Sequence, residues 1–143
     1  MSKHISLVIP GKPVAKARPR VFRHGKFTRA VTPTNTVNYE TQIRERFATE
    51  YPGFEPMDGG LSLMLDADFP IPTSASKRKR ELMLDGEIYR VQKPDLDNVI
   101  KIVMDALTGL AYKDDSQIVE IAATKGWSET PRVSIELHPV RAE

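Results

Sequence analysis

The sequence contains no cysteine among its 143 residues, which excludes disulfide bridges, thiolate zinc sites and cysteine nucleophiles. It also lacks an apolar run of about 18 residues, the length that a transmembrane helix needs. The short apolar patch near the N-terminus has no small-residue cleavage site and is too short for a signal peptide. The simplest interpretation is an intracellular protein, and we expect it in the cytoplasm.

Acidic residues are absent from the first 39 positions, although the whole chain has 19 acids and 21 Lys and Arg. Such asymmetry favours a polyanionic partner for the N-terminal part, and a run of cations before the first acid favours a long polyanion over a small nucleotide. The alternative is a solvated basic face without a partner. The cations of this stretch are Lys3, Lys12, Lys16, Arg18, Arg20, Arg23, Lys26 and Arg29.

Hydrophobic content of 40% and a length of 143 residues are ordinary for one globular domain. No repeat, low-complexity tract or linker divides the chain, so residues 1–143 are expected to form a single α+β domain, a small mixed β-sheet with helices packed on one side. The predicted elements are, in order, a strand over 6–9, a basic loop or hairpin at about 11–30, a helix over 37–50, a strand over 61–69, a helix that includes 77–80, a helix after Pro94, and strands over 117–125 and 132–138.

Two of these predictions are specific enough to be checked in detail. The helix over 37–50 is capped by Thr34 or Asn35 and is expected to turn Val37, Ile43 and Phe47 towards the core. The last two strands are joined by the turn sequence WSETP, which favours an antiparallel hairpin.

The basic segment cannot be helical, because Pro13 and Pro19 interrupt it. His24-Gly25 between two short apolar pairs indicates a hairpin. Phe22 and Phe27 among the cations resemble a nucleic-acid surface with rings available for stacking, or else the two rings anchor the hairpin to the core. A second basic cluster at 77–80 is either another phosphate contact or a solvated helix face.

Four carboxylates flank the helix that follows Pro94. Asp95 and Asp97 come together only if Asp95 lies in the turn before the helix, which Pro94 favours; the alternative is that Asp95 is a simple N-cap. Whether Asp114 and Asp115 fold back towards that pair depends on packing. Oxygen ligands without nearby cysteine or histidine favour Mg²⁺, with Mn²⁺ as a substitute, over zinc.

Lys101 lies one turn beyond Asp97, where it can contact a scissile phosphate or protonate a leaving oxygen. The alternative is a salt bridge at i,i+4 spacing with Asp97 and Asp105, which is worth a few tenths of a kcal/mol. Asp105 is expected to be structural. Asp66 and Asp68, on the outer face of the 61–69 strand, are expected to face solvent rather than to bind metal.

The segments PDLDNVIKIVMDAL and YKDDSQIV closely resemble the RusA family of Holliday junction resolvases, endonucleases that cut four-way DNA junctions. The resemblance implies that Asp95, Asp97 and Asp115 are Mg²⁺-binding catalytic acids, with Asp114 as a further candidate ligand, and that Lys101 is the essential lysine. It also implies the family's small α+β fold and a homodimer that makes two symmetric nicks. The matching positions are Asp95, Leu96, Asp97, Asn98, Lys101, Asp105, Ala106, Leu107, Asp114, Asp115 and Gln117.

The long basic insert makes this chain similar to the longer phage- and prophage-type members of that family. We therefore expect an Mg²⁺-dependent endodeoxyribonuclease that resolves branched DNA in recombination and repair. The alternatives are a non-catalytic module that binds branched DNA and a metal-dependent phosphotransfer enzyme that acts on small nucleotides. The predicted DNA contacts are Lys12, Lys16, Arg18, Arg20, Arg23, Lys26, Arg29 and Lys125.

Overall fold

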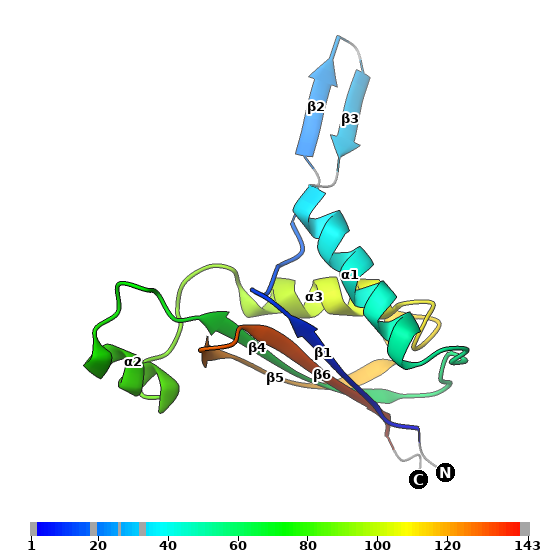
Figure 1. Cartoon of the computed structure of the whole chain (residues 1–143). Coiled ribbons are helices and arrows are strands. Elements are labelled where there is room, and N and C mark those ends of the chain that lie inside the picture. Colours follow the sequence, from blue (N-terminus) through cyan, green and yellow to red (C-terminus); the bar gives the residue numbers. More distant parts are fainter. Residues whose placement is uncertain (1–2, 18–19, 26, 32–33, 141–143) are drawn as a thin grey trace.

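The computed structural model describes residues 3–17, 20–25, 27–31 and 34–140, without the side chains of 20–24 and 27–31. Within these ranges a mixed sheet is combined with helices, as the sequence predicts (Figure 1). The elements are β1 Ile5–Pro10, β2 Arg20–His24, β3 Phe27–Val31, α1 Thr34–Glu50, β4 Leu61–Pro70, α2 Lys77–Leu84, α3 Leu96–Leu107, the 3₁₀ turn η1 Asp115–Gln117, β5 Ile118–Ser128 and β6 Arg132–Pro139.

The main sheet has the strand order β1-β6-β4-β5, in which only the β4–β5 pair is parallel. Helices α1 and α3 lie together on one face of it, while α2 lies beyond one end of the strands (Figure 1). This confirms the α+β class and the packing of helices on one side. No helix within the described ranges is long and apolar enough to cross a membrane.

β4 supplies the middle of the core because its side chains alternate strictly between the two faces. Its inward residues are at most 1% exposed and contact α1 and α3 together with the inward residues of β1 and β6. Each fully buried Leu or Ile of this kind stabilises the fold by about 1.5–3 kcal/mol. The inward residues of β4 are Leu61, Leu63, Leu65, Ala67 and Phe69.

α3 is the most strongly amphipathic helix and places its apolar stripe against β4 and β5. It is buried through Val99, Ile102, Val103, Ala106 and Leu107. The chain leaves the helix through Gly109, whose positive φ of 88° favours glycine.

α1 begins at Thr34 and buries Tyr39, Ile43 and Phe47, but the predicted burial of Val37 is wrong. Val37 is 47% exposed. The buried side chains of α1, with Thr36 as the first, are spaced by three or four residues, and Val37 lies about 200° around the helix from Tyr39 at 100° per residue. The sequence pattern missed Tyr39, which is buried.

The predicted hairpin between the last two strands is also wrong. β5 and β6 both exist, but β4 lies between them, paired parallel to β5 and antiparallel to β6. Only residues 129–131 separate the two strands. Their four Cα–Cα steps reach up to about 15 Å, more than the distance of about 10 Å across two strand spacings. A turn of this length therefore permits either a direct β5–β6 hairpin or a connection that crosses β4.

The basic hairpin is confirmed in its backbone. β2 and β3 pair antiparallel with His24 opposite Phe27, and Gly25 in the turn has a φ of 61°. Figure 1 shows the two strands standing away from the sheet, beyond the N-terminal end of α1. The directions of the Phe22 and Phe27 rings lie outside the described side chains.

Candidate functional site

Asp95 and Asp97 lie at the N-terminal end of α3. Asp95 occupies the N-cap position in extended conformation, yet its side chain makes no capping hydrogen bond, so the simple N-cap alternative does not hold. Its carboxylate is 54% exposed and lies 3.3 Å from the Lys93 ammonium. Asp97 is exposed in the first turn of the helix. Both carboxylates therefore present oxygens to solvent, beside the positive end of the helix dipole.

The segment before α3 is held in place by residues that the sequence did not single out. The Arg90 guanidinium lies 4.1 Å from the Phe69 ring centroid and 5.2 Å from that of Trp127, and it donates to the Lys93 carbonyl at 2.7 Å. Burial lowers the pKa of Arg90. From β5, the Lys125 ammonium donates to the carbonyls of Gln92 at 2.9 Å and Pro94 at 3.2 Å. Lys125, predicted as a DNA contact, thus positions the segment that carries Asp95.

Asp114 and Asp115 lie beyond the other end of α3, and both are exposed. The backbone N–H of Ser116 donates to Asp114 at 2.9 Å and holds the pKa of that carboxyl below its ordinary value. A hydrogen bond shared with Asp114 raises the pKa of Asp115, and the charge of nearby Asp105 adds to this effect. Two carboxylates that share a proton repel each other once both ionise, and a bound cation relieves that repulsion.

Gln117 fixes the loop that carries this pair. Its side-chain oxygen accepts from the backbone N–H groups of Lys113 at 3.0 Å and Asp114 at 3.1 Å. Its amide nitrogen donates to the carbonyls of Met57 at 2.8 Å and Gly59 at 3.0 Å. A glutamine here therefore satisfies four backbone groups at once, which gives the last residue of the YKDDSQ motif a positioning role.

Substitution Gln117→Ala is expected to lower the free energy of unfolding by about 1–3 kcal/mol, because it leaves backbone groups near the core without partners. Chemical denaturation checks this value. Lys113→Ala, in the same loop and exposed, serves as the control, since it is the backbone N–H of Lys113 that donates to Gln117. Equal stability of the two variants would contradict the role given to Gln117.

Asp105 has the structural role that the sequence predicts. It lies 3.2 Å from the Lys16 ammonium, which also pairs with Glu40 of α1. Burial lowers the pKa of Lys16, but the hydrogen bonds to these two carboxylates outweigh that effect and raise it overall. Lys16, predicted as a DNA contact, therefore ties the segment after β1 to α1 and α3.

Lys101 is exposed on α3. Within the part of the chain that the structure describes, it forms no ion pair with Asp97 or Asp105. The salt-bridge alternative for this lysine is not what the structure shows. Its ammonium remains available to a ligand.

The two acid pairs lie at opposite ends of α3. They therefore do not form one compact metal site within the chain. The 12 residues of α3 extend over roughly 16–18 Å. Asp115 is near Asp105, which is eight residues and therefore about 12 Å beyond Asp97 along the helix axis. Among the described residues, no three acidic or histidine side chains are grouped closely enough to hold one metal ion.

The other predicted DNA contacts lie in or before the hairpin. Lys12 is exposed just after β1. Arg20, Arg23 and Arg29 lie on β2 and β3, with side chains outside the described part. Arg18 and Lys26 lie outside the described residues altogether.

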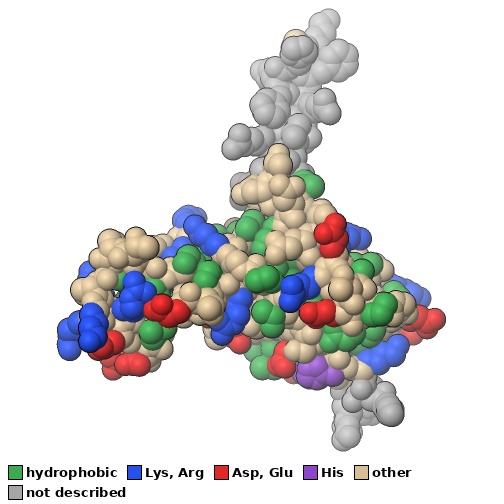
Figure 2. All heavy atoms as spheres, in the orientation of Figure 1, with side chains coloured by type: hydrophobic (Ala, Val, Ile, Leu, Met, Phe, Trp, Pro, Cys, Tyr) green, Lys and Arg blue, Asp and Glu red, His purple; other side chains and the backbone are tan. Residues whose placement is uncertain are grey.

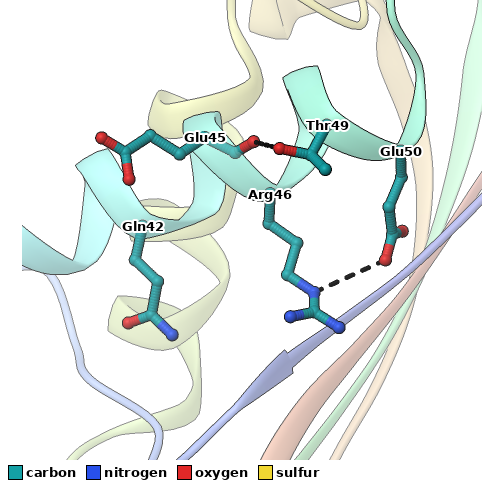
Figure 3. Close-up of a pocket in the computed structure, with 5 residues that line it drawn as sticks. All are labelled: Gln42, Glu45, Arg46, Thr49 and Glu50. Carbon is teal, nitrogen blue, oxygen red and sulfur yellow. Dashed lines mark hydrogen bonds and ion pairs between the residues drawn. The ribbon is translucent and has the colours of Figure 1, made fainter.

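The surface has two concave regions that lie in different places relative to the predicted site residues. One lies along α1 and is lined by residues of that helix alone, among them Arg46 and Glu50, which form an ion pair at 3.5 Å (Figure 3). The other lies between α2 and β5 and includes Arg90, Lys125 and Trp127. Only the second adjoins the segment that carries Asp95. Lys and Arg side chains gather beside it on α2 (Figure 2).

The family model described as Endodeoxyribonuclease RusA matches residues 10–138. The chain belongs to the RusA endodeoxyribonuclease family. The match spans β4, β5 and nearly all of β6, both acid pairs and Lys101, so the RusA motif lies within a match over most of the chain and is not an isolated resemblance.

Two relatives are similar to this RusA-family chain. The uncharacterized protein YqaN of Bacillus subtilis (strain 168) is 36% identical over 141 residues, which cover 96% of this chain and 98% of YqaN. The crossover junction endodeoxyribonuclease rusA of Lactococcus phage r1t is 43% identical over 53 residues, which cover 36% of this chain and 40% of the phage protein.

Proposed function

We propose that this RusA-family nuclease resolves four-way DNA junctions by paired nicks in an Mg²⁺-dependent reaction, and that it acts inside the cell in recombination and repair. The observation that supports this most is the family match over residues 10–138, which contains exposed acids and an exposed lysine in the family's motif. The name of the phage relative, a crossover junction endodeoxyribonuclease, points to the same substrate.

The residues fit Mg²⁺ in their chemistry. Asp95, Asp97 and Asp115, with Asp114 as a further candidate, offer exposed carboxylate oxygens, and Mg²⁺ is usually bound by one or two carboxylates with water and substrate phosphate completing its shell. Mn²⁺ is expected to substitute. A bound ion would activate a water and offset the negative charge that develops on the phosphate oxygens in the transition state.

Lys101 is proposed to contact the scissile phosphate or to protonate the leaving oxygen. It lies one helical turn after Asp97 and is exposed on the same helix. A cation at this place stabilises the additional negative charge of the transition state more than the charge of the ground state.

The basic hairpin β2–β3 is proposed to contact the DNA backbone of the junction arms, with Lys12 beside it. Its strands carry Arg20, Arg23 and Arg29 and no acid. Paired nicks at symmetric positions require two active centres, so the active form is proposed to be a homodimer.

Mapping the products of fixed and mobile four-way junctions tests the proposal. We expect paired, symmetric nicks in the presence of Mg²⁺ and none in EDTA. A parallel binding assay is needed, because junction binding without any cleavage in Mg²⁺ or Mn²⁺ would support the alternative of a non-catalytic branched-DNA-binding module. Equal cutting of linear duplex and junction would contradict structure selectivity.

Neutralising Arg20, Arg23 and Arg29 to Gln is expected to weaken binding to all junction sequences alike. Each lost phosphate contact should reduce the slope of log affinity against log salt by about 0.9. Binding titrations at several salt concentrations in EDTA measure this slope. The matched control, with the same loss of charge, is Gln at Lys77, Arg78 and Lys79 of α2; an equal or larger effect there would assign the DNA contact to α2 instead.

A further inference from the structure

Tyr89 and Val91 are exposed in the segment that joins α2 to α3. Tyr89 is 76% exposed and Val91 is 88% exposed. The residues that alternate with them, Ile88 and Arg90, are partly buried. Burial therefore alternates along 88–91, and the two apolar side chains lie on the outer side of the segment, away from the core. Tyr89 also lines the concave region between α2 and β5, so open space adjoins its ring.

The backbone of this segment is nevertheless anchored. The Trp127 indole N–H donates to the Ile88 carbonyl at 3.0 Å. The Arg90 guanidinium lies over the rings of Phe69 and Trp127, which are cation–π contacts. These contacts hold the chain on both sides of the exposed tyrosine. Its ring is therefore presented to solvent from a positioned segment, which reduces the entropy that a ligand must remove when it binds.

The same segment leads directly to the candidate active site. Tyr89 precedes Asp95 by six residues, so their Cα atoms are at most about 20 Å apart. Phosphates along one DNA strand are about 3.4 Å apart, so a base in contact with Tyr89 lies within roughly six nucleotides of a phosphate at Asp95. Between these two residues the sequence has Arg90 and Lys93 but no acid, which is compatible with a DNA strand that runs along the segment.

A flat ring exposed in this way is complementary to the face of a DNA base. Stacking of a base on an aromatic side chain is tolerant of sequence, because every base has a π face. In an uninterrupted duplex, however, each base pair is covered on both faces by its neighbours. Base-pair faces become accessible only where the stack is interrupted, as at the branch point of a four-way junction.

We propose that Tyr89 is a specificity-determining residue, whose ring stacks on the open face of a base pair at the branch point and so favours branched over linear DNA. The inference rests on the proposed junction-cleaving function and deepens it. The ring adds affinity for the junction and none for an uninterrupted duplex. It also places the branch point close to Asp95, where the strand is to be cut.

Binding of Tyr89→Ala to a four-way junction and to a linear duplex of equal length, both in EDTA, tests the inference. We expect junction affinity to fall about 10- to 100-fold, the loss of one base–ring stack, while duplex affinity stays within about twofold of wild type. Tyr89→Phe keeps the ring and should bind like wild type, whereas Tyr89→Leu, apolar but not flat, should bind like Tyr89→Ala. Equal losses on junction and duplex, or undiminished junction affinity of Tyr89→Ala, would overturn the proposal.

Val91→Ala is the matched control. It removes apolar area at a still more exposed position of the same segment, but no ring. Its junction affinity should remain within about twofold of wild type. A loss as large as that of Tyr89→Ala would mean that apolar area in general binds the junction, which contradicts stacking. The thermal unfolding midpoint should be unchanged in all these variants, since both side chains are exposed.

A fluorescent base locates the contact. Aminopurine, whose emission falls when a ring stacks on it, is placed either at the branch point or in the middle of an arm. With saturating protein in EDTA, the complexes of wild type and Tyr89→Phe should emit less than that of Tyr89→Leu when the probe is at the branch point. With the probe in the arm, all three should emit equally. Equal emission at the branch point would contradict the stacked ring.

The outcomes separate this inference from the function on which it rests. A wild-type protein that binds and cuts linear duplex as well as the junction would contradict the proposed function. A selective wild type whose selectivity survives in Tyr89→Leu would overturn only the role of Tyr89. The same conclusion follows if Tyr89→Ala changes the oligomeric state in sedimentation while DNA selectivity stays intact, because the ring would then belong to a protein interface.

Discussion

Substitution Asp97→Asn is expected to reduce cleavage of a synthetic four-way junction at least ~100-fold in Mg²⁺. Asparagine keeps the shape of the side chain but removes the negative charge that the metal requires. Asp97 is exposed and contributes no ion pair to the described fold, so its charge is not needed for folding. Cleavage rates under single-turnover conditions measure the loss, and binding in EDTA is expected to be retained.

Asp58→Asn provides the control for this variant. Asp58 is another exposed aspartate, in the loop before β4 and outside the family's motif. It should leave both cleavage and the thermal unfolding midpoint unchanged. If Asp97→Asn cut the junction at the wild-type rate, the metal-site assignment would fail; if it lowered the unfolding midpoint as well, loss of activity alone would say nothing about metal.

The secondary structure was predictable because it depends on local patterns. The period-two alternation of β4 appears directly in its burial. Ser76 accepts a hydrogen bond from the backbone N–H of Lys79 and caps α2. Gly109 stops α3 as glycine does at many helix ends. Each of these residues acts on neighbours within four positions.

Strand order was not predictable in the same way. The turn between β5 and β6 satisfies the local signals of a hairpin, but the chain crosses over β4. The choice is made by burial: β4 has the most complete apolar face, and a central position covers both of its edges. Such a preference arises from the whole sheet and has no signature in the turn sequence.

In the candidate site, too, only the features that depend on nearby residues were predictable. The lead-in position of Asp95 followed from Pro94. Lys16 contacts Glu40 and Asp105, which lie 24 and 89 positions away from it. Lys125 contacts the carbonyls of Gln92 and Pro94, which lie 33 and 31 positions away. Sequence spacing within one motif cannot reveal contacts over such distances, and it equally could not show that α3 keeps the acid pairs apart.

Lys101→Met is expected to lower the cleavage rate about 10²–10³-fold while leaving junction affinity and stability close to those of the wild type. Methionine preserves most of the aliphatic length of lysine, and removing the charge breaks no ion pair with the neighbouring acids in the described structure. A large loss of rate would therefore reflect chemistry and not folding. Lys113→Met, which removes another exposed lysine next to the acid loop, is the control.

A second variant distinguishes the two roles proposed for Lys101. Arginine keeps the positive charge and can contact a phosphate, but it does not release a proton near neutral pH. If the lysine acts by charge, Lys101→Arg should recover much of the activity lost in Lys101→Met. If it protonates the leaving oxygen, Lys101→Arg should be as slow as Lys101→Met on a normal junction, and both should recover on a substrate whose leaving oxygen is replaced by a better leaving group. Wild-type rates for Lys101→Met would remove the lysine from the mechanism.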